Sequence, residues 1–317
     1  MSSTQSFLSL ALNKKKLRCE RFLDEMDQVI PWYKLINKIE QYYKEKKTGR
    51  NRKETKLMLK IYFLQQWYNL SDPAAEETIY DRNSFQKFLN IDLLSDNIPD
   101  ETTILNFRHL LEENNLQEKF FKIMNKVLEK NGLIIKEGTI LDATIITAPS
   151  STKNKDGKRD PEMSSTKKGN DWYFGMKAHI GVDHKSGIVH SVKTTTAKIH
   201  DKEMQNDLLH GKEKAIFGDK GYYKEEDKRE MREQEIFCGI LDKGKRNHPL
   251  SNKQKRKNKK LSSIRAKVEH PFQVIKCQWN YTKVRYKGLL KNTMQLNVLF
   301  GLANLYMNRK KLIEIMA

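Results

Sequence analysis

Apolar residues recur every three or four positions through the first part of the chain, which is the pattern of helices that bury one face. Leu57, Ile61 and Leu64 show this spacing. Ser71-Asp72-Pro73 then supplies a helix cap and a first-turn proline, and Pro99-Asp100 precedes another helical repeat. We therefore predict an all-α region over residues 1–130.

A different pattern begins at residue 139. Residues 139–146 are β-branched and apolar on both faces, as expected of a central strand. Two further strand-like runs, 174–182 and 188–195, flank the sequence Asp-His-Lys-Ser-Gly and predict a hairpin. The stretch 148–171 is rich in Ser, Lys, Gly and Asn, so we predict a loop there.

Helices and strands alternate after the hairpin. The order of elements along the chain is β-β-β-α-β-α-β, which predicts an α/β fold. We expect a mixed five-stranded sheet with flanking helices in a domain that spans residues 131–317. The remaining predicted strands are 215–217 and 236–241, and the predicted helices are 201–209, 223–234, 263–279 and 292–311.

The chain is strongly basic, with 60 Lys and Arg against 40 Asp and Glu and a net charge of +20. Such an excess favours nucleic acid as partner, since cationic side chains that neutralise phosphates release condensed counterions. A charged, soluble surface without a special partner is the alternative. The excess is densest at residues 245–260, which hold eight basic residues and no acidic one, and which we expect to form a solvated loop-like arm.

Cysteine use and hydropathy indicate a reducing compartment. Cys19, Cys238 and Cys277 have neither metal-ligand spacing nor the density of a disulfide framework. The apolar stretch 7–12 is too short for a signal sequence, and residues 292–308 contain polar side chains that suit a packed core helix better than a membrane span. We expect a cytoplasmic protein without a membrane partner.

Two aspartates stand in or directly after predicted strands. Asp142 interrupts the apolar run 139–146, where an unpaired charge is costly, so it is either an ion-pair partner or a metal ligand. Asp219 follows the strand 215–217 with a glycine on either side of Asp219-Lys220, at the kind of strand end where ligands collect. Its plainer interpretation is a turn residue before a helix.

Glu269 is the third acid of interest, at the border of the apolar helical stripe that includes Phe272 and Ile275. Arg265 and Lys276 fall beside it, so Glu269 is either half of a surface ion pair or part of an acidic site. Three converging carboxylates would suit Mg²⁺ or Mn²⁺, and two such ions ~3.5–4 Å apart catalyse in-line displacement at phosphorus.

Short motifs follow one another in a specific order along the chain. They are Pro99–Thr103 with Phe107-Arg108, Leu141–Thr144, Phe174–His179, His200-Asp201, Gly218–Tyr222, Val268–Phe272, Lys283–Tyr286 and Leu299–Leu305. In this order they resemble the DDE transposases, whose catalytic domain has a ribonuclease-H-like fold, and especially bacterial insertion-sequence transposases of the IS-five group. The resemblance covers the chain from about residue 50 to 310.

The resemblance implies a DNA transposase in which Asp142, Asp219 and Glu269 are the catalytic and metal-binding triad. It also implies two Mg²⁺ (or Mn²⁺) ions, phosphodiester hydrolysis at the ends of an insertion sequence, and 3′-hydroxyl strand transfer into target DNA. Arg265 and Lys276 match the family's Arg-x3-Glu-x6-Lys signature, whose basic residues contact phosphate or DNA. Further DNA contacts are expected from Lys283, Arg285, Lys287, Lys255, Arg256 and Lys257.

The expected partner is double-stranded DNA, both terminal inverted repeats and target, bound by a homodimer in the nucleoid. Residues 1–130 would bind DNA ends or dimerise, and residues 131–317 would form the catalytic domain with the arm 245–260. His200 and Asp201 either support the metal ligands or simply start a helix.

Some alternatives stay open at the level of sequence. A plain metal-dependent nuclease of the same fold and a catalytically silent DNA-binding regulator both fit the residues. Trp172 and Tyr173 either pack in the core or a loop or stack on a base near an element end. We expect His179 and His190 to be ordinary strand residues.

Overall fold

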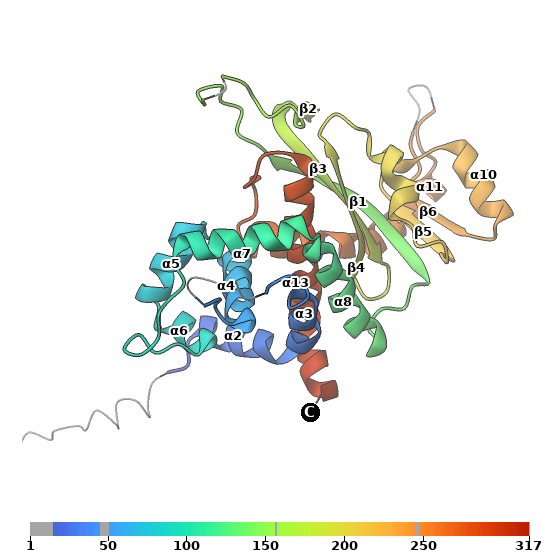
Figure 1. Cartoon of the computed structure of the whole chain (residues 1–317). Helices are drawn as coiled ribbons and strands as arrows, with labels where there is room; N and C mark the ends of the chain where they lie inside the picture. The colour runs from blue at the N-terminus through green and yellow to red at the C-terminus, as the bar shows by residue number, and fades with distance from the viewer. Residues whose placement is uncertain (1–14, 45–50, 156, 245–247, 317) are drawn as a thin grey trace, which may run out of the picture.

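The computed structural model describes residues 15–44, 51–155, 157–244 and 248–316. The apolar stretch 7–12 therefore lies outside the described residues. The described N-terminal part is all-α, as predicted (Figure 1). Its helices are α2 (Arg18–Val29), α3 (Trp32–Ile39), α4 (Thr55–Tyr68), α5 (Asp72–Asp81), α6 (Asn83–Leu89), α7 (Glu101–Glu113) and α8 (Leu116–Lys130).

Both predicted helix starts carry side-chain caps. The hydroxyl of Ser71 accepts a hydrogen bond from the Ala74 N–H (3.2 Å), and Asp100 accepts one from the Thr103 N–H (2.7 Å). Each cap satisfies a backbone donor that the first turn leaves without a partner. Helices α5 and α7 therefore begin where the sequence predicts.

A mixed sheet of six strands follows the helices. The strands are β1 (Gly138–Thr147), β2 (Ser164–Lys168), β3 (Asp171–Asp183), β4 (Val189–Thr196), β5 (Ala215–Gly218) and β6 (Phe237–Ile240). β3 runs antiparallel to β1, β2 and β4, whereas β5 pairs in parallel with both β1 and β6. The structure confirms the α/β class, with a mixed sheet, flanking helices and a helical N-terminal region.

The prediction of five strands and of a loop over 148–171 was wrong in one respect. β2 forms inside that stretch and pairs with the start of β3 around Gly169, whose φ of 63° suits a tight turn. Both faces of β2 are polar, so no hydrophobic alternation marks it in the sequence. A glycine-containing turn between polar runs was the available signal.

The helices between the later strands are shorter than predicted. They are the 3₁₀ helix η1 (Asp201–Met204) with α9 (Gln205–Leu208), the 3₁₀ helix η2 (Lys220–Tyr222) and α10 (Glu225–Glu233).

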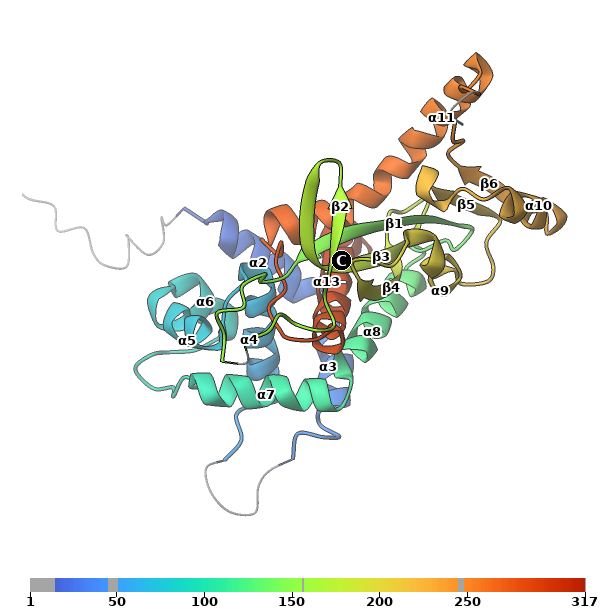
Figure 2. The same cartoon turned by 90° about the horizontal axis from the view of Figure 1, so that it is seen from above.

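The basic arm is a helix rather than a loop, which corrects the prediction for residues 252–260. α11 (Asn252–Arg265) starts with a reciprocal cap, in which the Ser251 hydroxyl accepts from the Gln254 N–H and Gln254 accepts from the Ser251 N–H. Lysine, arginine and glutamine are good helix formers, so this cap suffices to start the helix. Figure 2 shows α11 projecting from the body of the molecule. Residues 245–247 of the arm lie outside the described part.

α11 continues directly into three short helical segments, and a long helix closes the chain. These are the 3₁₀ helix η3 (Ala266–Val268), α12 (Glu269–Gln273), the π-helix η4 (Val274–Gln278) and α13 (Leu289–Met316).

One hydrophobic core joins the two predicted domains. α13 packs against α8 and α2 of the N-terminal region and against β4 of the sheet (Figure 1). The core runs from Leu23 to Leu312, and packing is continuous across residue 130. Among the described helices none is long and apolar enough to span a lipid bilayer.

Candidate functional site

Asp142 lies on β1, and Asp219 directly follows the last residue of the neighbouring parallel strand β5. Ile140 of β1 pairs with Phe217 of β5, and β5 ends one residue later at Gly218, so the chain leaves the sheet at Asp219 near the level of Asp142. Side chains alternate between the two faces along a strand. Asp142 therefore points to the face that carries Ile140.

Glu269 approaches the same face from the first residue of α12. Arg265, one helical turn earlier, bridges two of the acids: its Nη1 lies 3.2 Å from Asp142 Oδ2 and its Nη2 lies 3.6 Å from Glu269 Oε1. The structure thus contains both ion pairs that the sequence offered as alternatives to metal binding: one between Arg265 and Asp142, and an i,i+4 pair between Arg265 and Glu269. The same two contacts place Glu269 near the strand that carries Asp142.

The helix keeps this position because its opposite side is buried. Val268, Phe272, Ile275 and Trp279 are all buried, as the helical wheel predicts. The side chain of Glu269 is 58% exposed, whereas that of Asp142 is only 15% exposed. The helix therefore presents Glu269 at the rim of the site and Asp142 forms its floor.

Negative charge is concentrated around Asp142. Burial raises the pKa of its carboxyl to about 6, the charge of Arg265 opposes this rise, and the charges of Glu269 and Asp219 add to it. The influence of both acids on this pKa places their charges close to Asp142. A site of this kind attracts a cation, and a guanidinium already lies between two of the acids.

The donor set suits a hard divalent cation, but the ligands are not drawn together. Carboxylate oxygens are the ligands that Mg²⁺ and Mn²⁺ prefer. In the described part of the chain, no three acidic, histidine or cysteine side chains are close enough to hold a metal ion as they stand. Arg265 would have to give up Asp142 for an ion to reach it.

Tyr222 is a buried residue near these acids that sequence reasoning did not single out. It is fully buried, and its hydroxyl has no hydrogen-bond partner among the described residues. Burial raises its pKa, and the charges of Asp201, Asp142 and Asp219 raise it further. The signal available in the sequence was its place in Gly218–Tyr222, where the missing side chain of Gly218 leaves room for the tyrosine ring.

His200 and Asp201 make contacts other than with the three acids. His200 caps η1 by accepting a hydrogen bond from the Lys202 N–H (3.2 Å). Asp201 pairs with Lys177 at 2.9 Å and lies 3.9 Å from Nδ1 of the buried His179. Lys177 and His179 alternate with Ile180, which is paired with Asp142, so they face the other side of the sheet.

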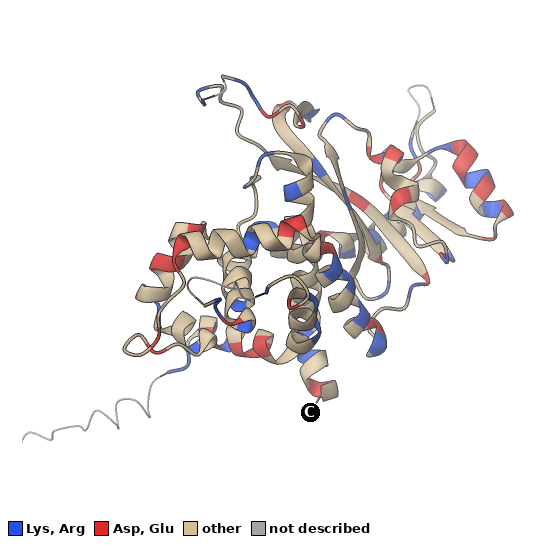
Figure 3. Ribbon diagram, in the orientation of Figure 1, with Lys and Arg blue, Asp and Glu red and all other residues tan. Residues whose placement is uncertain are grey.

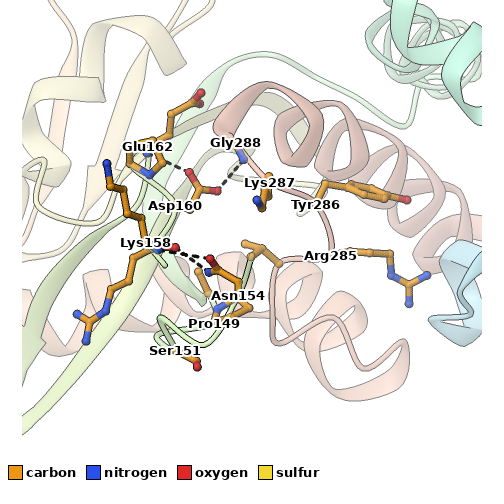
Figure 4. Close-up of a pocket in the computed structure, with 14 residues that line it drawn as sticks. Pro149, Ser151, Asn154, Lys158, Asp160, Glu162, Arg285, Tyr286, Lys287 and Gly288 are labelled. Carbon is orange, nitrogen blue, oxygen red and sulfur yellow. Dashed lines mark hydrogen bonds between the residues drawn. The ribbon is translucent and has the colours of Figure 1, made fainter. Parts of the chain in front are cut away.

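Three of the predicted DNA-binding side chains are engaged within the protein: Arg265, through its contacts with Asp142 and Glu269, and Lys276 and Arg285. Lys276 Nζ donates to Thr144 Oγ1 (2.7 Å) and to the carbonyl of Ile145 (2.8 Å), beside Asp142 on β1. Arg285 donates to the carbonyl of Leu70 and to the carbonyl and side-chain oxygens of Asn69. Figure 4 shows Arg285 extending away from the pocket that its loop lines.

The other predicted DNA contacts are exposed. Lys283 lies beside the end of β1, where it forms a parallel bridge with Thr147. Lys287 lines a pocket of about 550 Å³ together with Lys158 and Asp160 (Figure 4). The basic residues of the arm, Lys255, Arg256 and Lys257, are exposed on α11. All five residues are exposed to solvent.

Comparison with known families identifies the chain. A model of the transposase DDE domain matches residues 135–305, more than half of the chain and the part that holds all three acids. A transposase domain of the DUF772 type matches residues 12–110. The chain belongs to the DDE transposase family and is a DNA transposase. The IS-five group is a finer assignment that neither match makes.

The class carries general properties with it. DDE transposases cleave DNA and transfer strands, typically with divalent metal ions, and the protein is a DNA-binding enzyme of this class. Among solved structures, the crystal structure of the Mos1 strand transfer complex is similar at 12% sequence identity, over 77% of this chain and 82% of that chain, with a TM-score of 0.20. The family assignment rests on the two sequence matches.

Proposed function

We propose that this transposase hydrolyses phosphodiester bonds at the ends of an insertion sequence and then joins the freed 3′-hydroxyls to target DNA. Asp142, Asp219 and Glu269 would hold two Mg²⁺ (or Mn²⁺) ions. When bound, such a pair of ions activates the attacking oxygen and stabilises the leaving oxygen of an in-line displacement. The fold supplies a rigid base, since Asp142 lies on β1 and Asp219 directly follows the paired strand β5.

The observation that carries the proposal is the register of β1 and β5. It brings Asp219, which follows β5, near the level of Asp142 on β1, 77 positions earlier in the sequence, and Arg265 pairs with both Asp142 and Glu269. The raised pKa of Asp142, to which burial and then the charges of Glu269 and Asp219 contribute, supports this grouping. A cluster of this kind is costly in a folded protein unless it serves a cation.

The chain's own residues would prepare this site. Arg265 keeps Asp142 and Glu269 paired in the present structure, and in the DNA complex its guanidinium would move to a phosphate, the partner for which its fork is also suited. Lys276 fixes the backbone of β1 just past Asp142. Lys283, Lys287 and the exposed side of α11 would bind the DNA backbone.

The proposal extends to partners. Two element ends must be joined, so a homodimer on double-stranded DNA, with terminal inverted repeats and target both bound, is the expected working form. Residues 1–130 would contribute end recognition or dimerisation. We place the protein in the bacterial cytoplasm, on the nucleoid.

The test is Asp142→Asn, with cleavage of a duplex that carries the element end measured in Mg²⁺. We expect the variant to bind the duplex as the parent does and to lose cleavage by several orders of magnitude, because the neutral amide is a poor ligand for a hard cation. Asp207→Asn, which changes an exposed carboxylate of α9, is the matched control and should cleave normally.

The same assay separates the rival functions. Strand-transfer products on a target plasmid would distinguish a transposase from a plain nuclease, which cuts without joining. Equal behaviour of Asp142→Asn and parent in every step would favour a silent DNA-binding regulator and would exclude the proposed triad.

A further inference from the structure

The hairpin of β2 and β3 extends beyond the main sheet. β1 ends at Thr147, which pairs with Gly175, whereas β3 continues back to Asp171 with only β2 beside it. Figure 2 shows this two-stranded ribbon reaching out past the strands behind it. The ribbon therefore presents side chains to solvent on a stiff support that is continuous with β3.

The end of this hairpin combines an aromatic ring with positive charge. Trp172 is 70% exposed and pairs across the hairpin with Lys167, which is exposed together with Lys168. A tryptophan that packs in a core or under a loop is not this accessible. The sequence allowed Trp172 either to pack within the protein or to stack on a base. The structure excludes packing within the described part of the chain.

The hairpin is connected to the face that carries the three acids. Ile180 of β3 pairs with Asp142, and Trp172 lies eight residues earlier on the same uninterrupted strand, so both side chains share that face of the sheet. At ~3.3 Å per residue, the two positions are at most roughly 26 Å apart. Burial lowers the pKa of Lys276, and the charge of Lys168 lowers it further.

The surroundings of the hairpin are basic. The neighbouring loop carries Lys153, Lys155, Lys158 and Arg159, and Figure 3 shows the positive residues along this loop, whereas α10 at the far edge of the sheet is rich in acidic residues. Asp160 and Glu162, two acids of the same loop, accept hydrogen bonds from the backbone N–H groups of Gly288 and Leu289. The hairpin end itself carries one exposed acid, Asp171, beside Lys167 and Lys168, so positive charge is in excess there.

We propose that the β2–β3 hairpin is a DNA-binding finger that contacts the duplex next to the cleaved end. Lys167 and Lys168 would bind phosphates, and the Trp172 indole would stack on a base or wedge against a base step. This inference rests on the proposed function, because it takes the scissile phosphate to lie at Asp142. At ~3.4 Å per base pair, the contact falls within about eight base pairs of that phosphate.

The test uses footprinting of uncut DNA. Hydroxyl-radical protection and affinity are measured with the Asp142→Asn protein on a synthetic duplex that carries the inverted repeat bordering the reading frame. Adding Trp172→Ala should weaken binding about five- to 100-fold and remove protection only within about eight base pairs of the cleavage position. Trp172→Phe should restore most of both, since the ring is what stacks.

Two controls separate a contact from a folding defect. Phe237→Ala removes an aromatic ring that is 53% exposed on β6, and it should leave affinity and footprint unchanged. Changing both Lys167 and Lys168 to Gln should lower the slope of log affinity against log salt by up to about 1.8, with the same thermal unfolding midpoint.

Three outcomes overturn the inference, and they differ in what else they overturn. An unchanged footprint and affinity for Trp172→Ala would remove the finger while leaving the proposed function intact. Failure of the Asp142→Asn parent to protect the element end at all would remove both. Poly-glutamate at an equal concentration of charge could also displace the duplex, and Trp172→Ala would then no longer lower the affinity for DNA. That result would indicate that the hairpin binds an acidic protein instead.

Discussion

Asp142 sits in a strand that is otherwise apolar, and its neighbours explain how the charge is tolerated. Arg265 pairs with one carboxylate oxygen, and the Ala143 N–H donates to the other at 2.9 Å. A buried carboxylate with these two partners is stable only while the guanidinium stays, because removing one member of such a pair leaves an uncompensated charge. Any ligand that draws Arg265 away must therefore bring a cation with it.

Two histidines give the protein a specific response to acid. Burial lowers the pKa of His190 to about 4, and that of His179 likewise, against about 6.5 in an unfolded chain. Because the folded values are the lower ones, the unfolded chain binds more protons between these limits. Stability from this source is complete above about pH 6.5 and is lost as the pH falls toward 4.

Replacing His190 by Gln should therefore flatten the pH dependence of unfolding. Each histidine contributes a slope of up to about 1.4 kcal/mol per pH unit in this window, and urea unfolding from about pH 7 to about pH 5 measures it. The exposed His248→Gln is the control and should follow the parent. Equal slopes for all three proteins would contradict this assignment.

The acids of the candidate site can be predicted from the sequence, but the hydrogen-bond partners of its basic side chains cannot. Asp142 and Asp219 stand out because a charge in or after an apolar strand breaks a simple pattern. The acceptors that hold Lys276 and Arg285 come from β1 and from the end of α4, and nothing in the local sequence indicates such distant partners. Tyr222 escaped notice because a buried tyrosine looks the same as any core residue.

At the scale of elements, β2 and α11 were missed for a common reason. β2 is polar on both faces, and α11 is polar throughout residues 252–260, so neither stretch shows the hydrophobic period from which secondary structure is predicted. α11 is held by its cap and by Asn258, whose side chain bonds the N–H and the carbonyl of Asp242 at 2.9 and 3.0 Å. Elements with a buried face, such as β1 and α7, were found close to their observed positions.

The exposed charges of α11 should act in DNA binding rather than in folding. We expect the triple change of Lys255, Arg256 and Lys257 to Gln to lower the salt slope of DNA binding by up to about 2.7, at ~0.9 per phosphate contact, without changing stability. The same change at Lys224, Arg229 and Arg232, in and just before α10, removes equal exposed charge from a part of the chain with no proposed DNA contact. An equal loss for both triples would mean that only total charge matters.

At the scale of the whole molecule, polar networks as well as the shared core fasten the N-terminal helices to the sheet domain. The buried Arg108 pairs with Asp72 at 2.9 Å and with Glu112 at 2.8 Å, and its guanidinium lies 4.7 Å from the ring centre of Tyr286. This joins α5 and α7 to the loop before α13. The two predicted domains are therefore expected to unfold together.

Arg108→Ala should lower the free energy of unfolding by about 3 kcal/mol or more, because two carboxylates lose a buried partner. Urea unfolding followed by tryptophan fluorescence and by circular dichroism measures this, and the two signals should coincide in parent and variant. Arg232→Ala, an exposed residue of α10, should change stability by less than about 0.5 kcal/mol. Separate transitions for the two signals would show two independent domains.

The short helix that begins at Glu269 is bracketed by one turn that is wound too tightly and one that is wound too loosely. The 3₁₀ turn Ala266–Val268 precedes it and the π turn Val274–Gln278 follows it. Turns of this kind inside a helix often mark hinges. We therefore expect the exposed carboxylate of Glu269 to adjust its position relative to Asp142 while the buried Phe272 and Trp279 keep their places in the core.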